Sequence, residues 1–230
     1  MEKNYTLFFT HIPKCGGNGL NNIFKNLGYK TNNLCSKSCG HKDNTKENYL
    51  ITENGNYPDR DISCEKSVRN IINNPKVINL IGHHVFPRKK QKGDILIASI
   101  RNPYDLMVSR WKYHNKEVPN QQYTFEEWVN NFAGETLMRF IENCFENGDS
   151  KKEMIVDYFI KLESIDKDIN NLINLKYLQT NCSNEEIKKY CFMKSNTTTH
   201  KHFDFYYNTD LKNKVYKSNK LIFDMFGYER

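Results

Sequence analysis

The sequence predicts an α/β fold in which a P-loop-like parallel sheet is flanked by helices in three layers. Two observations predict this class. Short, nearly continuous apolar runs, typical of strands buried on both faces, alternate with segments of helical periodicity. In addition, two of the strand-to-helix junctions carry residues suited to a phosphate site. With 230 residues and 38% hydrophobic content, we expect a single domain over residues 1–230.

The expected elements follow in order along the chain. A strand at 5–10 leads through a glycine-bearing turn into a helix whose apolar residues recur at helical spacing. A polar, irregular excursion with short elements is expected at about 29–74. Beyond it, we expect strands at 77–81, 95–100 and 158–162, helices from Pro103 and near 125–133, 136–145, 151–157, 166–175 and 184–190, and one amphipathic helix over 210–227.

A candidate phosphate loop lies between the first strand and its helix, with the sequence HIPKCGGNG at residues 11–19. Backbone N–H groups and the helix dipole make such a junction an anion site, and glycines let the backbone approach a phosphate closely. Lys14 adds a point charge, and it precedes the glycines, unlike the lysine of a Walker loop. The alternative is a plain glycine-rich turn. The predicted contacts are Lys14, Cys15, Gly16, Gly17, Asn18 and Gly19.

A second candidate phosphate clamp begins at Arg101, where the strand at 95–100 ends. Ser109 follows two turns into the helix that starts at Pro103, so both side chains can face one anion. Arginine supplies a fork-shaped pair of donors, and serine supplies a hydroxyl. Alone, this is an ordinary strand-end arginine before a helix start. Together with the first loop, it indicates a ligand that carries two separate phosphates.

These two segments resemble a known family. HIPKCGG at 11–17 is similar to the 5′-phosphosulfate loop of the carbohydrate (Golgi-type, family 2-like) sulfotransferases, and RNPYDLMVS at 101–109 is similar to their 3′-phosphate site. The segments 159–168 and 206–228 also look like the family, whereas 29–74 is unmatched. The resemblance implies a sulfotransferase that uses 3′-phosphoadenosine 5′-phosphosulfate (PAPS). Where the family usually has hydroxyl residues, this chain has Asn18 and Gly19.

Sulfuryl transfer to a hydroxyl needs a general base opposite the leaving phosphate, and histidine has the right pKa range. His83 and then His84 are the candidates, because the family often carries Gly-His after the corresponding strand. A structural or surface histidine pair is the alternative, and Glu53 or Asp94 would be considered if neither histidine acts. The resemblance also suggests Lys201 as a further donor contact.

The net charge of +7 suits an anionic ligand. A basic run at 88–92 beside the histidines fits either a solvated loop or an acidic glycan acceptor, and the resemblance favours a carbohydrate hydroxyl. Two rival functions are a nucleotide or small-molecule kinase and a basic glycan- or RNA-binding module without catalysis. The kinase would need a magnesium-binding Ser/Thr after the loop lysine, and the binding module would leave two spaced phosphate motifs unexplained. We expect no nucleic-acid partner.

Seven cysteines form an odd set, so at least one is unpaired within the chain. A loose zinc-like spacing relates Cys35, Cys39, His41 and Cys64. Free thiols or a local disulfide are favoured over a zinc site at these residues. We therefore expect no metal. No signal peptide or membrane-spanning apolar segment is evident, so we expect a soluble chain as given, whose compartment and oligomeric state stay open.

Overall fold

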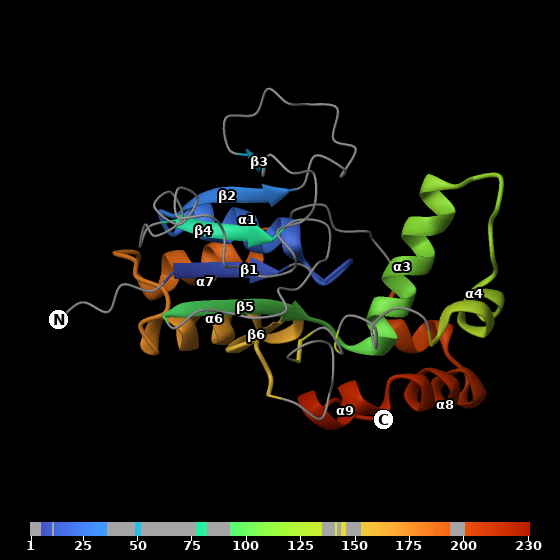
Figure 1. The fold of residues 1–230 in the computed structure, drawn as a ribbon. Helices are drawn as coiled ribbons and strands as arrows, with labels where there is room; N and C mark the ends of the chain where they lie inside the picture. Colours follow the sequence, from blue (N-terminus) through green and yellow to red (C-terminus); the bar gives the residue numbers. More distant parts are fainter. Residues whose placement is uncertain are drawn as a thin grey trace. The chain divides into compact units, whose positions relative to one another are not determined.

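The computed structural model describes residues 6–10, 12–35, 49–51, 77–81, 93–134, 141, 144–145, 153–193 and 201–230. Its contacts separate two compact units. The first comprises Met1–Ile100 and Asn143–Ser195, and the second comprises Arg101–Glu142 and Asn196–Arg230. The first unit contains the sheet, and the second is helical (Figure 1). The single domain expected over the whole chain stays a prediction.

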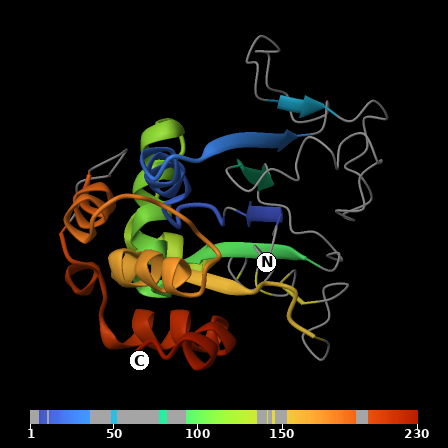
Figure 2. The ribbon, with the colours of Figure 1, turned by 90° about the vertical axis from the view of Figure 1, so that its left-hand side faces the viewer.

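In the described residues, a sheet of six parallel strands has the order β3-β2-β4-β1-β5-β6 (Figure 2). After β1 the chain crosses to one side of this strand, and after β4 it crosses to the other side. The carboxyl end of β1 is therefore the topological switch point, where open α/β sheets bind ligands. The predicted parallel α/β class is confirmed. The strands are β1 (Thr6–Thr10), β2 (Lys30–Cys35), β3 (Tyr49–Ile51), β4 (Val77–Ile81), β5 (Asp94–Ile100) and β6 (Tyr158–Lys161).

The neighbouring strands β1 and β5 are buried along their whole length. Side chains alternate between the two faces of a strand, so Leu7, Phe9 and Ile97 pack in one hydrophobic cluster while Phe8 and Leu96 are buried outside it. Both faces need apolar residues, which explains the continuous apolar runs TLFFT and DILIASI. The four predicted strands are confirmed to within one residue at each end.

Two short strands lie inside the excursion expected at 29–74. β2 has the polar sequence KTNNLC and pairs in parallel with β4, from Lys30 opposite Val77 to Leu34 opposite Ile81. Its residues carry little β propensity or alternation. The backbone hydrogen bonds that a neighbouring strand supplies outweigh this weak propensity, so tertiary context forms a strand that the pattern does not predict.

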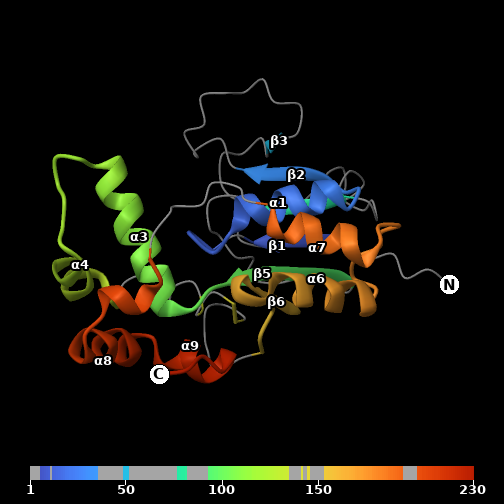
Figure 3. The same cartoon turned by 180° about the vertical axis from the view of Figure 1, so that it is seen from behind.

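Three helices lie on one face of the sheet: α1 (Gly17–Asn26), α6 (Ile165–Asn174) and α7 (Asn184–Phe192) (Figure 3). The apolar stripe of α1 packs on β1, where the rings of Phe24 and Phe9 meet edge to face with centroids 5.4 Å apart. Fully burying a side chain of this size contributes about 1.5–3 kcal/mol. All three predicted helices are confirmed, and the bounds of α6 and α7 differ from the predicted ones by at most two residues.

A buried carboxylate connects β6 to α6 through the short 3-10 turn η3 (Leu162–Ser164). Asp168, which is 9% exposed, accepts hydrogen bonds from the Lys161 N–H at 2.8 Å, the Ser164 hydroxyl at 3.0 Å and the Tyr158 hydroxyl at 2.9 Å. Burial raises the pKa of Tyr158, which keeps its hydroxyl available as a donor. The carboxylate therefore holds the strand end, the turn and the helix start together.

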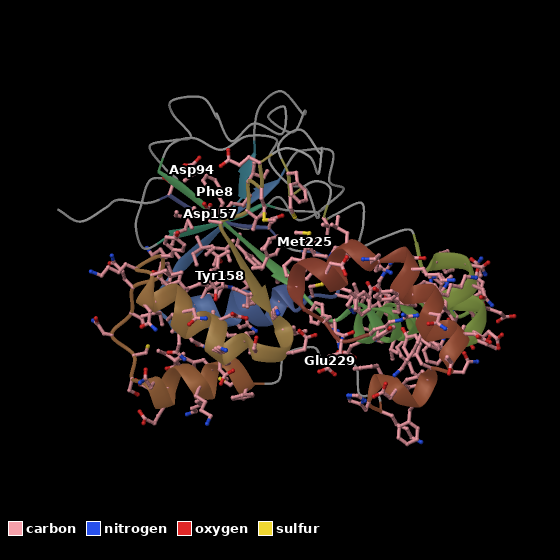
Figure 4. The ribbon with its side chains drawn as sticks, turned by 90° about the horizontal axis from the view of Figure 1, so that it is seen from below. Phe8, Asp94, Asp157, Tyr158, Met225 and Glu229 are labelled. Atoms are coloured by element: carbon pink, nitrogen blue, oxygen red, sulfur yellow. The ribbon has the colours of Figure 1, made fainter. Side chains whose placement is uncertain are left out.

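The helix predicted at 151–157 is wrong for its described residues. Met154 forms an isolated antiparallel bridge with Phe145. Asp157, the residue before β6 (Figure 4), accepts the Leu96 N–H through its side chain at 2.8 Å and donates its own N–H to the Leu96 carbonyl at 2.8 Å. These two hydrogen bonds with β5, one of them through the Asp157 side chain, hold an extended chain where the local sequence suggests a helix. The helix expected near 136–145 falls mostly outside the described residues.

The second unit packs its helices around aromatic side chains. Tyr104 lies at its centre, with its ring centroid 5.0 Å from that of Phe223 and 5.1 Å from that of Tyr207. Such pairs add about 0.5–1.5 kcal/mol each beyond the area they bury. The helices expected from Pro103 and near 125–133 are confirmed. The elements are α3 (Pro103–Glu117), α4 (Phe125–Phe132), the 3-10 turn η4 (Phe203–Tyr206), α8 (Thr209–Ser218) and α9 (Lys220–Phe226).

The single helix predicted over 210–227 is two helices, α8 and α9, that meet at Asn219. This residue is 3% exposed, and its side-chain amide donates to the Ala133 carbonyl at 3.0 Å and the Val215 carbonyl at 2.9 Å. The interaction with Ala133 pulls the chain out of helical geometry, because asparagine readily exchanges helix bonds for side-chain bonds. The apolar periodicity continues through the break, which is why the sequence reads as one helix.

Candidate functional site

The loop after β1 is anchored by two buried side chains. Ile12 and Cys15 are both 0% exposed, and the Cys15 N–H donates to the Ile12 carbonyl at 3.1 Å. Between them, the half-buried Lys14 has a left-handed backbone with φ of 64°. This conformation costs a residue with a Cβ atom about 1–2 kcal/mol. Anchored neighbours thus hold Lys14 in a strained geometry of the kind found at ligand sites.

Helix α1 begins without a side-chain cap. Its N-cap residue, Gly16, has φ of 75° and ψ of 16°. The first intrahelical bond runs from the Leu20 N–H to the Gly16 carbonyl at 2.9 Å, so the amides of residues 17–19 precede the helical ladder. The first turn contains no acidic residue, and Asn18 is exposed. Backbone amides and the positive end of the helix dipole therefore form a potential anion site.

The loop rests against the turn that follows β6. A Cβ atom at Gly16 would lie 2.5 Å from Cδ1 of Leu162, which belongs to η3. Gly16 is therefore required by both its left-handed backbone and this close approach. The sequence motif identifies Gly16, but nothing in the motif indicates the contact with Leu162, since the two residues are far apart in the chain.

The second motif starts where β5 ends. Asn102 caps α3 by accepting the Tyr104 N–H at 2.9 Å, and Pro103 occupies the first helical position, where its missing N–H costs nothing. Arg101 precedes this cap, and Ser109 is a buried residue of α3 with 3% exposure. The predicted order of strand end, arginine, helix start and serine is thus present.

The Arg101 guanidinium pairs with a carboxylate that sequence reasoning missed. Nε of Arg101 donates to Asp105 Oδ2 at 2.7 Å, and Nη2 lies 2.6 Å from the same oxygen. Arg101, Asp105 and Ser109 follow one another at intervals of four residues, the spacing that places side chains on one helix face. An acidic residue four positions after a strand-end arginine is the signal that could have found this pair.

The strands that carry the two motifs are neighbours. β1 and β5 run parallel, with Thr10 opposite Ala98, so both strands end at the same edge of the sheet. β4 pairs with β1 on its other side and ends there as well, with Thr10 opposite Ile81. The first phosphate loop follows β1, Arg101 follows β5, and the Gly-His-His segment follows β4 in the sequence.

Several predicted site residues lie outside the described part of the chain. These are His83 and His84, Glu53 and the basic run at 88–92. Asp94 is described and lies at the opposite, amino end of β5, where it pairs with Thr6. Four residues of strand, about 13 Å, separate that end from the end that carries the phosphate loop. Asp94 is therefore far from a reaction at the candidate phosphate loop, which argues against it as the alternative base.

Lys201 lies just before η4. Its Nζ is 4.5 Å from the centre of the Phe205 ring, and its N–H donates to the Tyr206 hydroxyl at 3.3 Å. The contact of Lys201 with the donor stays a prediction.

No three His, Cys, Asp or Glu side chains gather as a metal site in the part of the chain that the structure describes. Cys39, His41 and Cys64 of the zinc alternative lie outside that part, as does the side chain of Cys35. None of the described helices is long and apolar enough to cross a bilayer.

Comparison with known proteins supports the fold and identifies the family. The sequence model of the Sulfotransferase family matches residues 1–229. The crystal structure of mouse sulfotransferase SULT7A1 complexed with PAP is similar, with 16% identity and a TM-score of 0.58 over 96% of this chain and 84% of that chain. At this identity the likeness concerns the fold, and it confirms the predicted sulfotransferase fold. No curated protein matches the chain. Because the family match extends over almost the whole sequence, the protein belongs to the Sulfotransferase family and is an enzyme of that family.

Proposed function

We propose that the protein transfers a sulfuryl group from PAPS to a hydroxyl of a carbohydrate acceptor. The observation that carries the proposal is the pair of phosphate motifs that follow the neighbouring strands β1 and β5 in a member of this family. PAPS carries separate 5′ and 3′ phosphates, which need two cationic sites. The similar mouse sulfotransferase is complexed with PAP, the donor without its sulfuryl group.

The loop at residues 14–19 fits the 5′-phosphosulfate. Its helix start has no acidic residue in the first turn and no side-chain cap, so negative charge is favoured there. Asn18 and Gly19 lack the hydroxyl groups common in the family, which leaves the backbone amides and Lys14 as the main donors. Buried Cys15 serves as an anchor of the loop.

The segment from Arg101 to Ser109 fits the 3′-phosphate. A guanidinium binds phosphate oxygens through paired, charge-assisted hydrogen bonds, and a hydroxyl can add another. Adenosine 5′-phosphate lacks the group that this clamp would bind. Discrimination between the two nucleotides is therefore the direct chemical consequence of the assignment.

The reaction is an in-line displacement at sulfur. The acceptor oxygen forms a new S–O bond while the bond from sulfur to the bridging phosphate oxygen breaks, and both bonding electrons of that bond leave with the phosphate. His83, with His84 as the second candidate, takes the acceptor proton. Lys14 and the loop amides stabilise the charge that develops on the leaving phosphate. Fixed cationic groups can do this without a metal ion.

A carbohydrate acceptor is supported by the resemblance of the two motifs to carbohydrate sulfotransferases. The net charge of +7 and the basic run at 88–92 suit an acidic glycan. A kinase is disfavoured because Cys15, Gly16 and Gly17 follow the loop lysine where a magnesium-binding hydroxyl would be needed.

Incubation with sulfur-labelled PAPS and a panel of neutral and acidic glycans, lipids, phenols and peptides tests the proposal. Label should move to a glycan, and PAP should raise the melting temperature more than adenosine 5′-phosphate does, because ligands selective for the native state stabilise it. The Lys14→Ala variant, with weaker donor binding and turnover, is the control. Transfer to a different class would overturn the acceptor assignment. No transfer, with equal thermal shifts from both nucleotides, would overturn the function.

A further inference from the structure

Asp105 contacts one edge of the Arg101 guanidinium. Both Nε, at 2.7 Å, and Nη2, at 2.6 Å, address the same carboxylate oxygen, Oδ2. A guanidinium is a planar fork whose N–H donors point in fixed directions, so a partner on the Nε edge also sets the direction of the Nη1 side. The Asp105 carboxylate thus constrains the orientation of the whole group.

The pair is partly withdrawn from water. The Arg101 side chain is 14% exposed, and that of Asp105 is 25% exposed. Charges in such surroundings are screened less than on the open surface. Exposed side chains of this length lose much of the value of an ion pair in ordering entropy, whereas partly buried ones are already constrained by packing.

The carboxylate itself stands on a rigid support. Asp105 occupies the third position of α3, where the Asn102 cap, the Pro103 start and the helix dipole all favour it. The Tyr207 hydroxyl donates to the Tyr104 carbonyl at 3.0 Å and ties the same turn to the aromatic cluster. Burial, together with the charges of Tyr104 and Asp105, raises the pKa of Tyr207, so the phenol remains a neutral donor.

We propose that Asp105 is a positioning residue that holds Arg101 in the orientation required to bind the 3′-phosphate, and that Asp105 thereby sets the preference of the enzyme for a 3′-phosphorylated donor. The inference rests on the proposed function, in which Arg101 contacts that phosphate. A flexible arginine side chain loses conformational entropy when the donor binds. An arginine that is already oriented has lost this entropy during folding, so donor binding is less costly. Asp105 acts through Arg101 and does not itself touch the nucleotide.

Two opposite effects are possible when a carboxylate stands next to a phosphate-binding arginine. Orientation raises the affinity for the 3′-phosphate, and repulsion between like charges lowers it. In the ion pair, the carboxylate contacts the Nε edge of the guanidinium, so a phosphate bound from the opposite side would have the cation between itself and the carboxylate. We therefore expect the gain from orientation to exceed the loss from repulsion. Whether Asp105 raises or lowers the affinity for the 3′-phosphate can be measured.

The test compares dissociation constants for PAP and adenosine 5′-phosphate by calorimetry, using the whole chain of 230 residues. Asp105→Asn should lower the preference for PAP by about tenfold, the value of roughly one charge-assisted hydrogen bond, and leave the affinity for adenosine 5′-phosphate nearly unchanged. A general loss of structure would weaken the binding of both nucleotides and leave the ratio of their dissociation constants unaltered. Asp224→Asn is the matched control. It removes the same charge from another (i, i+4) pair, with Lys220, that is exposed on α9.

The remaining variants separate this inference from the proposed function. Arg101→Ala should abolish the preference, and adding Asp105→Asn to it should change nothing further, because coupled residues are not additive. Asp105→Glu keeps the charge at the helix start but displaces the carboxylate, so it should also lower the preference for PAP. This variant provides the test if Asp105→Asn fails to fold.

Two results would overturn the role of Asp105 alone: a preference that survives or increases in the folded Asp105 variants, or an effect of Asp105→Asn in the Arg101→Ala background. A preference that survives in Arg101→Ala would overturn the proposed clamp, and this inference with it.

Discussion

At the residue scale, the left-handed backbone of the candidate phosphate loop connects single positions to the proposed function. Lys14 and Gly16 both have positive φ, at 64° and 75°, around the buried side chain of Cys15. Glycine adopts this backbone without steric cost, whereas Lys14 is strained, and such strain persists only where the surroundings impose it. The loop is therefore preorganised by the fold, and substitutions in it should affect both stability and donor binding.

Gly16→Ala should destabilise the protein more than Gly28→Ala. Both glycines have positive φ, at 75° and 91°, so each replacement costs about 1–2 kcal/mol in backbone strain. Only Gly16 has a close neighbour, Leu162, whereas nothing lies within 4 Å of a Cβ atom at Gly28. Denaturant unfolding measures both free energies, and PAP affinity should fall only in Gly16→Ala. Equal effects of the two variants on stability would show that the contact with Leu162 is unimportant.

His83→Ala should separate binding from chemistry. Turnover should fall by about 10²–10⁴-fold, the usual contribution of a general base, while PAP affinity stays nearly unchanged. Lys14→Ala should lower both, because the proposed function puts its charge next to the phosphate in the ground state and the transition state. Single-turnover kinetics and calorimetry measure the two effects. Should His84→Ala lose activity instead, the base is one residue further on. An active double variant would exclude histidine.

At the scale of elements, the β6–η3–α6 connection packs against the candidate phosphate loop. Asp168 fixes η3, and η3 carries Leu162 to Gly16. A β-strand, a turn and a helix thereby act as one rigid piece. Replacing this carboxylate should therefore destabilise the protein more than removing one surface charge does.

Asp168→Asn should lower the free energy of unfolding by about 2 kcal/mol or more, because an amide cannot accept from three donors and leaves at least one unsatisfied. Asp166→Asn is the control. It lies in the first turn of the same helix and should cost only the helix-dipole contribution, about 0.3–1 kcal/mol. Urea denaturation of the two variants gives the comparison. Similar losses would mean that the buried hydrogen bonds of Asp168 are replaceable.

At the scale of the whole molecule, the net charge of +7 should aid the capture of a highly anionic donor. PAP affinity should decrease several-fold as sodium chloride rises from about 0.05 to 0.2 M, since the Debye length shortens to below about 10 Å. Adenosine, which has no phosphate, should show almost no salt dependence in the same calorimetric titrations. A PAP affinity independent of salt would argue against binding by cationic side chains.

Much of the fold was predictable because its signals are local. The continuous apolar runs of β1 and β5 reflect burial on both faces, and each passes directly into a helix whose start is encoded by glycines or by Asn102-Pro103. Strand, loop and helix are contiguous in such a unit. A motif within it can therefore be placed at a strand end from sequence alone, which is how Lys14 and Arg101 were found.

Only the tertiary structure determined the features in which distant residues meet. Polar β2 forms because β4 and β3 supply its backbone partners, and the C-terminal helix breaks because Asn219 binds the carbonyl of Ala133. The same holds for Leu162 against Gly16, and for the position of Asp94 at the amino end of β5, which depends on strand direction. Periodicity and motifs reflect the local structure of one segment. The packing partners of these residues depend on how distant segments come together in the fold.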